Sequence, residues 1–240
     1  MKKILITGYN GFLGNHLLKE LLKDFYVIGL EKNPNKQFFN KNFASYRSDS
    51  EIEYIFEENE IFSVIHLATL YRIENNSIGE LLETNLNLPV KLMEMCNKYN
   101  VNLFINTDSF FNDEKYNYSY LPIYTLSKKN CLEWLKLISS EGNCKLVNMK
   151  IFHMFGENDS NNKFINRIIN KIKKNNEDHI DLTDGIQKRD FIYVLDVVAA
   201  FVRVIKSFDK LNNKFYNFEV GTGKAISIKN AVKLIKDISK

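Results

Sequence analysis

Short apolar runs alternate with longer amphipathic segments through the first two-thirds of the chain. Runs typical of buried strands cover Lys3 to Thr7, Tyr26 to Leu30, Ala44 to Arg47, Ser63 to Leu67, Val101 to Asn106 and Lys145 to Ile151. Segments typical of helices lie between them, at Gly11 to Lys23, Glu51 to Glu58, Leu81 to Asn100 and Tyr124 to Ser139. Such alternation predicts parallel strands joined by right-handed crossovers, with helices on both faces. We therefore expect an α/β protein with a doubly wound parallel sheet.

The alternation loosens after Gly156. Helices are expected at Phe164 to Lys174, Asp196 to Ser207 and Ile228 to Ser239, with short strands at Ile180 to Leu182 and Phe215 to Val220. No Pro- or Ser-rich linker marks a flexible boundary. We therefore expect a sheet domain over residues 1–155 and a small lobe over 156–240, from which 186–207 returns to the first domain.

Composition excludes several classes of protein. The chain has 240 residues, 45% of them hydrophobic and 26% charged, as in ordinary globular proteins. The densest basic run, Lys171-Ile172-Lys173-Lys174, ends an amphipathic pattern and favours a solvated helix face over a nucleic-acid patch. No apolar run approaches the roughly 18 residues that span a bilayer. The three cysteines are scattered without metal-ligand spacing, and the first apolar run is too short for a signal peptide. We expect a cytoplasmic protein without a metal, nucleic-acid or membrane partner.

A glycine-rich turn follows the first expected strand. Gly8, Gly11 and Gly14 are spaced G-x-x-G-x-x-G, where the first permits a tight turn, the second lets backbone approach a pyrophosphate, and the third lets helix and sheet pack closely. The following helix start offers N–H groups and a positive dipole end to phosphates. The turn therefore predicts a dinucleotide site, with cofactor contacts from Gly8, Asn10, Gly11, Phe12, Leu13 and Gly14.

Carboxylates near the next two strands bear on which dinucleotide binds. Glu31 lies 17 residues after Gly14, where it can accept hydrogen bonds from the adenosine ribose, which slightly favours NAD. Lys32 and Lys36 could instead receive the 2′-phosphate of NADP. Asp49 could meet the adenine amino group, or it could cap the helix that starts near Glu51.

A second motif, Tyr124-Thr125-Leu126-Ser127-Lys128, suggests proton transfer. Tyr124 and Lys128 are four residues apart and share a helix face, so the ammonium can lower the pKa of the phenol and also hydrogen-bond the nicotinamide ribose. Thr107 ends the fifth strand, at the edge where ligands bind in open α/β sheets. Together with a dinucleotide, these residues predict hydride chemistry on a carbonyl or an alcohol.

With these motifs the chain resembles extended short-chain dehydrogenases/reductases of the NAD-dependent epimerase/dehydratase family, which act on nucleotide sugars. The matching stretches are Thr7 to Gly14, His66-Leu67-Ala68, Thr84-Asn85, Thr107-Asp108-Ser109, Tyr124 to Lys128, and Arg189 to Val194 with Asp196. The resemblance implies a Rossmann-like fold with a small C-terminal substrate lobe, and Thr107, Tyr124 and Lys128 as catalytic residues. It also implies that Leu67 and Ala68 pass along the cofactor and that Arg189 contacts the diphosphate of a nucleotide diphosphate sugar.

Departures from the family pattern narrow the predicted reaction. Sugar 4,6-dehydratases similarly carry a Thr-Asp-Glu run, whereas this chain has Ser109 in place of the glutamate base, which argues against elimination of water. His153 stands where Asn is usual, and we expect Asp108, Ser109, His153 and Arg189 to line the substrate site, with simple packing as the alternative for His153. The run around Thr107 is similar to reductases that make CDP-linked dideoxyhexoses such as paratose and abequose.

The predicted function is reduction of a 4-keto nucleotide sugar by NADH or NADPH. A nucleotide-sugar 4-epimerase, which uses the same three residues, and a non-catalytic dinucleotide-binding regulator stay open as alternatives. Resemblance to homodimeric relatives favours pairing through helices Leu81 to Asn100 and Tyr124 to Ser139, although a buried outer face within one subunit explains their apolar residues too. Family members commonly run further than Lys240, so part of the substrate lobe is expected to be missing.

Overall fold

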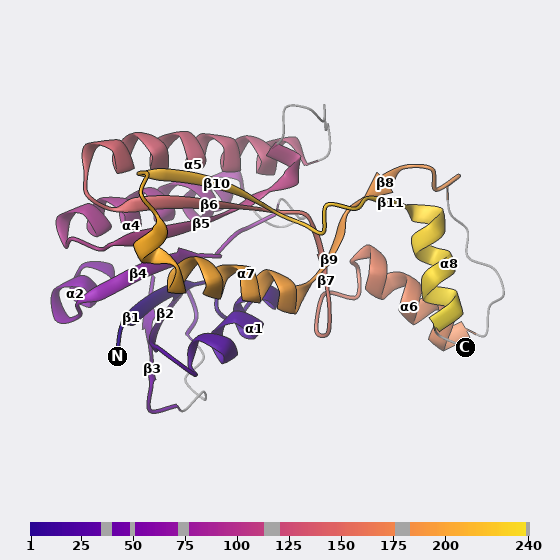
Figure 1. The fold of residues 1–240 in the computed structure, drawn as a ribbon, viewed down its shortest axis with the longest axis horizontal. Helices are drawn as coiled ribbons and strands as arrows, with labels where there is room; N and C mark the ends of the chain where they lie inside the picture. Colours follow the sequence, from indigo (N-terminus) through magenta and orange to yellow (C-terminus); the bar gives the residue numbers. More distant parts are fainter. Residues whose placement is uncertain (35–39, 49–50, 72–76, 113–120, 176–182, 239–240) are drawn as a thin grey trace.

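A computed structural model of the chain describes residues 1–34, 40–48, 51–71, 77–112, 121–175 and 183–238. Its centre is a seven-stranded sheet in the order β10-β6-β5-β4-β1-β2-β3 (Figure 1). The strands are β1 (Lys3–Thr7), β2 (Tyr26–Glu31), β3 (Phe43–Arg47), β4 (Ile61–His66), β5 (Leu103–Ser109), β6 (Lys145–Ile151) and β10 (Phe215–Val220). Every neighbouring pair in it is parallel. The strand order reverses beside β1, as in a doubly wound fold, which confirms the predicted fold class.

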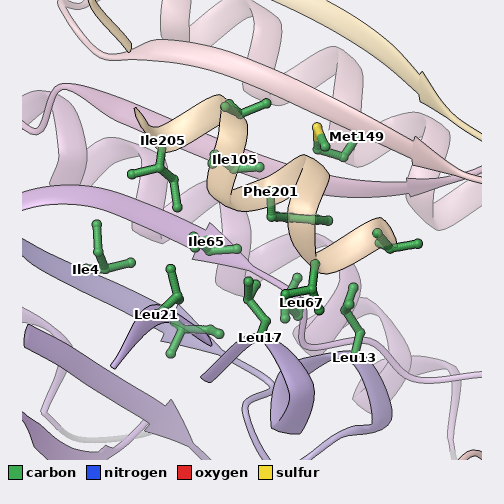
Figure 2. Packing of buried hydrophobic residues seen from close by; sticks show 14 of the residues in the cluster. Ile4, Leu13, Leu17, Leu21, Ile65, Leu67, Ile105, Met149, Phe201 and Ile205 are labelled. Carbon is green, nitrogen blue, oxygen red and sulfur yellow. The ribbon is translucent and has the colours of Figure 1, made fainter. Parts of the chain in front are cut away.

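Helices cover both faces of this sheet. On one face, α1 (Phe12–Leu21) and α7 (Val194–Lys206) bury their apolar sides with residues of β1, β4, β5 and β6. Figure 2 shows this layer, in which Leu17 and Phe201 approach Ile65 of the central strands. On the other face, α2 (Ile52–Glu58), α4 (Leu88–Lys98) and α5 (Pro122–Glu141) form a second core. Burial on both faces explains the near-continuous apolar runs of the strands.

The helix expected from Leu81 to Asn100 is three consecutive elements. Helix α3 (Ile78–Leu82) starts with a capping box between Ser77 and Glu80, a π-helical turn covers Glu83–Asn87, and α4 follows. Asn85 lies in the π turn, and its side chain bonds to the backbone of Leu70. A π turn bulges the helix outward at one residue, often at a functional site.

The C-terminal part is divided between the sheet and a separate group of elements. Strand β10 pairs with β6 along its whole length, so the return to the sheet extends beyond the predicted 186–207. Figure 1 shows α6 (Phe164–Asn175), α8 (Ile228–Ile238), β8 (Lys188–Arg189) and β11 (Ile226–Ser227) gathered at one end of the molecule. Strands β7 (His153–Phe155) and β9 (Phe191–Tyr193) connect this group to the sheet. The predicted strand Ile180 to Leu182 lies outside the described residues.

Candidate functional site

The three glycines of the first turn differ in what surrounds them. A Cβ atom on Gly14 would lie 2.0 Å from the Gly8 carbonyl oxygen, and one on Gly8 would lie 2.6 Å from the Ala68 nitrogen. The fold itself therefore requires glycine at these two positions. A Cβ on Gly11 would meet only the Gly8 carbonyl oxygen, at 3.2 Å, and Gly11 has an extended backbone that any residue can adopt. The fold itself therefore does not require glycine at position 11. A glycine is expected there if the pyrophosphate of a ligand lies close to the protein backbone.

Helix α1 begins at this turn with Gly11 as its N-cap and without a side-chain cap, so Phe12 and Leu13 form an uncapped first turn. Such a helix start suits a pyrophosphate. The Asn10 amide donates to the Glu31 carboxylate at 3.1 Å, which places the end of β2 beside the turn. Burial raises the pKa of Glu31 above its usual value, and the hydrogen bond from Asn10 offsets part of this rise. These residues fit a dinucleotide. Asp49, the other carboxylate predicted to bind it, lies outside the described residues.

The end of β4 is held against the end of β1. The Thr7 hydroxyl accepts hydrogen bonds from the amides of Leu67, at 3.2 Å, and Ala68, at 3.1 Å. Its own proton is therefore available to His66 Nδ1, which lies 2.9 Å away. Burial lowers the pKa of His66 well below its usual value, and Lys128 adds to this, so the ring is neutral. The predicted cofactor segment, Leu67 and Ala68, thus packs directly on the glycine turn.

The predicted catalytic residues come together at the carboxyl end of β5. Lys128 of α5 is 2% exposed, and its Nζ donates to the Thr107 carbonyl at 2.9 Å. The Thr107 hydroxyl donates to the His66 carbonyl at 2.8 Å and keeps its lone pairs for another donor. Burial lowers the pKa of Lys128, while Cys131 and Asp108 raise it. Thr107 and Lys128 are therefore joined through one backbone carbonyl.

Tyr124 lies in the same place, one helical turn before Lys128, and is 4% exposed. Its ring stacks on Tyr71 with centroids 4.6 Å apart. Burial raises the pKa of Tyr124 well above its usual value, Tyr71 and Asp108 raise it further, and a hydrogen bond with Ser109 lowers it. We expected Lys128 to lower this pKa, but the ammonium is turned to the Thr107 carbonyl instead.

Two contacts of this site were missed from the sequence. Tyr71 covers Tyr124, and Asn85 is completely buried with four hydrogen-bonded contacts. The Asn85 side chain bonds to Leu70 N at 2.8 Å, Leu70 O at 2.9 Å, Thr69 at 3.2 Å and Ser127 at 3.1 Å. Since Ser127 lies on α5, Asn85 ties that helix to the loop that carries Tyr71. A polar Thr84-Asn85 pair inside an apolar helical pattern was the available signal.

The predicted substrate residues are spread around the site. Ser109 is beside Tyr124, whereas the Asp108 carboxylate accepts hydrogen bonds from Ser109 N, Asn112 and Asn148. The ring centroids of His153 and Phe110 lie 4.0 Å apart. The Nδ1 atom of His153 is buried and has no hydrogen-bond partner among the described residues. Burial and the nearby Arg189 lower the pKa of His153 to about 4. Arg189 of β8 donates to the Lys188 carbonyl at 2.8 Å.

Asp190, between β8 and β9, holds the loop that follows β10, and the sequence did not predict this contact. Its carboxylate accepts from the amide of Thr222 at 3.0 Å, the hydroxyl of Thr222 at 2.6 Å and the amide of Gly223 at 2.8 Å. A Cβ on Gly221 would lie 2.6 Å from that carboxylate, and Gly223 has φ +75°. The loop after β10 is thereby fixed next to Arg189.

The part of the chain that the structure describes also bears on metal binding, on thiols and on membrane association. No group of three or more His, Cys, Asp or Glu side chains there could hold a metal ion. Cys96, Cys131 and Cys144 are buried and free. None of the described helices has the length and apolarity needed to cross a membrane.

The chain is similar to known proteins along most of its length. A model of the NAD dependent epimerase/dehydratase family matches residues 4–221. A CDP-abequose synthase of Salmonella muenchen is 36% identical over 98% of this chain and 80% of its own length. The corresponding protein of Salmonella typhimurium is 32% identical over 95% of this chain and 77% of its own.

Solved structures show the same fold. The UDP-N-acetylglucosamine 4-epimerase of Methanobrevibacter ruminantium aligns with a TM-score of 0.83 and 24% identity, over 99% of this chain and 82% of that one. The matches at sequence level cover the glycine turn and the predicted catalytic residues. The chain therefore belongs to the NAD-dependent epimerase/dehydratase family.

Proposed function

We propose that this protein is an NAD(P)-dependent reductase that transfers a hydride to the 4-keto carbon of a nucleotide sugar. The observation that carries the proposal is the grouping of half-buried Thr107 with buried Tyr124 and Lys128 at the carboxyl end of β5, on the same sheet edge as the open glycine turn. The Glu31 carboxylate beside Asn10 favours NAD slightly over NADP, because a 2′-phosphate would be repelled there.

The relatives support reduction of this kind of substrate. Two are named CDP-abequose synthase, and an Escherichia coli protein named dTDP-4-dehydro-6-deoxyglucose reductase is 27% identical over 97% of this chain. Ser109 stands where a dehydratase would carry its glutamate base, so no carboxylate is available at that position to remove a proton from the sugar. Reduction needs a hydride, a proton donor and an oriented ketone; a bound NADH or NADPH would supply the hydride, Tyr124 the proton and Thr107 the orientation.

The residues would divide the work as follows. A bound NADH or NADPH supplies the hydride. Tyr124 donates its phenolic proton to the ketone oxygen, and the Thr107 hydroxyl orients that oxygen. Lys128 holds the nicotinamide ribose and stabilises the phenolate that Tyr124 becomes. Tyr71 stacks on Tyr124, so its ring would move away from Tyr124 or contact the sugar when the substrate binds.

We place the sugar nucleotide between the sheet edge and the elements α6, α8, β8 and β11. Arg189 and His153 would face the diphosphate, since a guanidinium and an imidazole N–H both donate to phosphate oxygens. Asp108 and Ser109 are the further predicted contacts. The lobe assignment is tested by Arg189→Ala, which should raise the KM for the sugar nucleotide and leave the Kd for NADH unchanged.

The test of function is a substrate panel. Purified protein is mixed with CDP- and dTDP-linked 4-keto-6-deoxy sugars and with NADH or NADPH, and oxidation is followed at 340 nm in the nicotinamide absorbance. We expect oxidation with at least one ketone and none with the matching 4-hydroxy sugars. Absence of oxidation with every ketone would contradict the proposal.

A 4-epimerase is the second candidate, because the family includes such enzymes and a putative UDP-glucose 4-epimerase of Methanocaldococcus jannaschii is 27% identical over 97% of this chain. An epimerase returns the hydride to the same sugar and keeps its cofactor. Protein purified with tightly held NAD that interconverts 4-hydroxy sugars would favour this candidate, whereas an exchangeable cofactor favours the reductase.

We also propose that the protein forms a homodimer through α5. Leu126, Trp134 and Leu137 are 58%, 53% and 51% exposed and lie on one side of this helix, within about 80° at 100° per residue. Figure 1 shows α5 on the outside of its layer. Light scattering at micromolar concentration should give twice the monomer mass, and Trp134→Lys should reduce it to one. A monomer mass for the wild type would reject the dimer.

A further inference from the structure

A row of polar side chains crosses the sheet beneath α5. Its members stand at paired positions on neighbouring strands: Thr7, His66, Asn106, Asn148 and Asn217. Asn106 donates to Asn148 at 2.8 Å, and Asn148 donates to Asn217 at 2.8 Å. All but Asn217 are completely buried. Burying polar groups lowers the stability of a protein unless they are hydrogen-bonded. We therefore ask which function of the site the row supports.

One member of the row, Asn148, helps to hold the carboxylate of Asp108. Asn148 donates to Asp108 Oδ2 at 3.1 Å, while Oδ1 accepts from Ser109 N at 2.7 Å and Asn112 at 3.2 Å. Asp108 is only 3% exposed. These donors are all neutral, and a buried carboxylate is expensive unless a positive charge is near.

Lys128 carries a buried ammonium, the opposite charge to the buried carboxylate of Asp108. Its Nζ donates to the carbonyl of Thr107, the residue that precedes Asp108. The other titratable groups that act on Lys128 or face it are Tyr124, His66 and Cys131. His66 is neutral, and the pKa of Cys131 is raised to about 12, so neither supplies a negative charge near neutral pH. Lys150 stands opposite Asp108 in the register of β5 and β6.

We propose that Asp108 is a positioning residue whose carboxylate, fixed by Asn148 and the polar row, is the buried counter-charge of Lys128. The carboxylate keeps the ammonium in its charged form at the Thr107 carbonyl, where it serves Tyr124 and the cofactor ribose. This role acts through Lys128 and is separate from the substrate contact predicted for Asp108. The inference deepens the proposed function, since it assumes that Lys128 assists the reaction.

The test is the pH dependence of NADH affinity, which needs no sugar substrate. The Kd for NADH is measured from pH 7 to 10 by fluorescence for wild type, Asp108→Asn and Asn217→Ala. Affinity should fall as Lys128 loses its proton, and in Asp108→Asn the midpoint should move to lower pH by about one unit. Asn217→Ala removes a row member without removing a charge, and its midpoint should stay at the wild-type value.

Other outcomes would overturn the proposal. An unchanged midpoint in Asp108→Asn with a raised KM for sugar would mean that Asp108 contacts the substrate. An unchanged midpoint with a lowered melting temperature would mean that its role is structural only. If the wild type reduces no 4-keto sugar, the proposed function fails, but the NADH titration still decides the role of Asp108.

A second pair of variants covers the case in which Asp108→Asn folds poorly. Lys128→Met alone removes the counter-charge proposed for the buried Asp108 carboxylate, so its melting temperature should fall. The double variant, Asp108→Asn with Lys128→Met, removes both charges and should melt above Lys128→Met. Simple addition of the two single losses would show that the groups do not interact and would overturn the proposal.

Discussion

Gly11 and Gly14 should respond to the same substitution in opposite ways. In Gly14→Ala the new Cβ would lie 2.0 Å from the Gly8 carbonyl oxygen, so the helix start must shift. Overpacking of this kind costs about 2 kcal/mol. For a domain of this size, that corresponds to a fall in melting temperature of about 4–8 °C.

In Gly11→Ala the new Cβ meets only the Gly8 carbonyl oxygen, at 3.2 Å, and the extended backbone is allowed for alanine. We expect its melting temperature to stay within about 2 °C of wild type, because alanine at such a position changes stability by about 0.5 kcal/mol. The methyl group would, however, occupy the space of the pyrophosphate. Losing one charge-assisted hydrogen bond of about 1.5–3 kcal/mol weakens NADH about 10- to 100-fold.

Differential scanning fluorimetry and an NADH fluorescence titration on both variants measure these effects. Gly14→Ala serves as the matched control, because the same methyl group enters the same turn. Wild-type NADH affinity in Gly11→Ala would refute the assignment of the pyrophosphate site. A loss of stability in Gly11→Ala equal to that of Gly14→Ala would refute the conclusion that the fold requires glycine at position 14 and not at position 11.

Three further predictions address the catalytic residues and their supports. Tyr124→Phe should lower turnover by about 10²-fold or more and leave the Kd for NADH unchanged, in steady-state kinetics and titration; undiminished turnover would make Tyr124 structural. Asn85→Ala removes the side-chain partner of the part-buried Leu70 N–H and C=O and should cost about 2–3 kcal/mol by urea unfolding. A change below about 0.5 kcal/mol would contradict its bridging role. Because the pKa of His153 is about 4 when folded and 6.5 in its reference state, the unfolded protein binds more protons between these values, so stability falls as pH drops from 6.5 toward 4. His153→Asn should therefore lose less melting temperature than wild type between pH 7 and 4, and an equal loss would mean that His153 does not titrate in this way.

The sequence was sufficient for features that depend on local order. The glycine turn could be predicted because its spacing and its place after the first strand are both local. The same holds for Tyr124 and Lys128, which are one helical turn apart. The alternation of strands and helices predicted the sheet for the same reason, since each strand is buried on both faces.

Features that depend on distant contacts could not be predicted. The Asp108 carboxylate is held by Asn148, 40 residues later in the chain, and no local pattern encodes that contact. Tyr71 reaches Tyr124 only because the loop is anchored by Asn85. Strand β10 carries polar residues at Asn217 and Glu219, so its pattern did not reveal that it completes the central sheet.

The pKa of Tyr124 illustrates the same limit. Spacing along the helix suggested that Lys128 would lower the pKa, whereas burial and the Tyr71 ring raise it. Burial depends on the packing of α5 against the loop before α3, which no local pattern encodes.

Isotope transfer tests the central claim most directly. The protein is incubated with a CDP- or dTDP-linked 4-keto-6-deoxy sugar and NADH carrying deuterium at the transferable position, and the product is analysed by NMR and mass spectrometry. We predict one deuterium at C4 of the product sugar, one NADH oxidised per sugar reduced, and loss of both in Tyr124→Phe. A product with no deuterium at C4, or interconversion of 4-hydroxy sugars without net oxidation of NADH, would contradict the account.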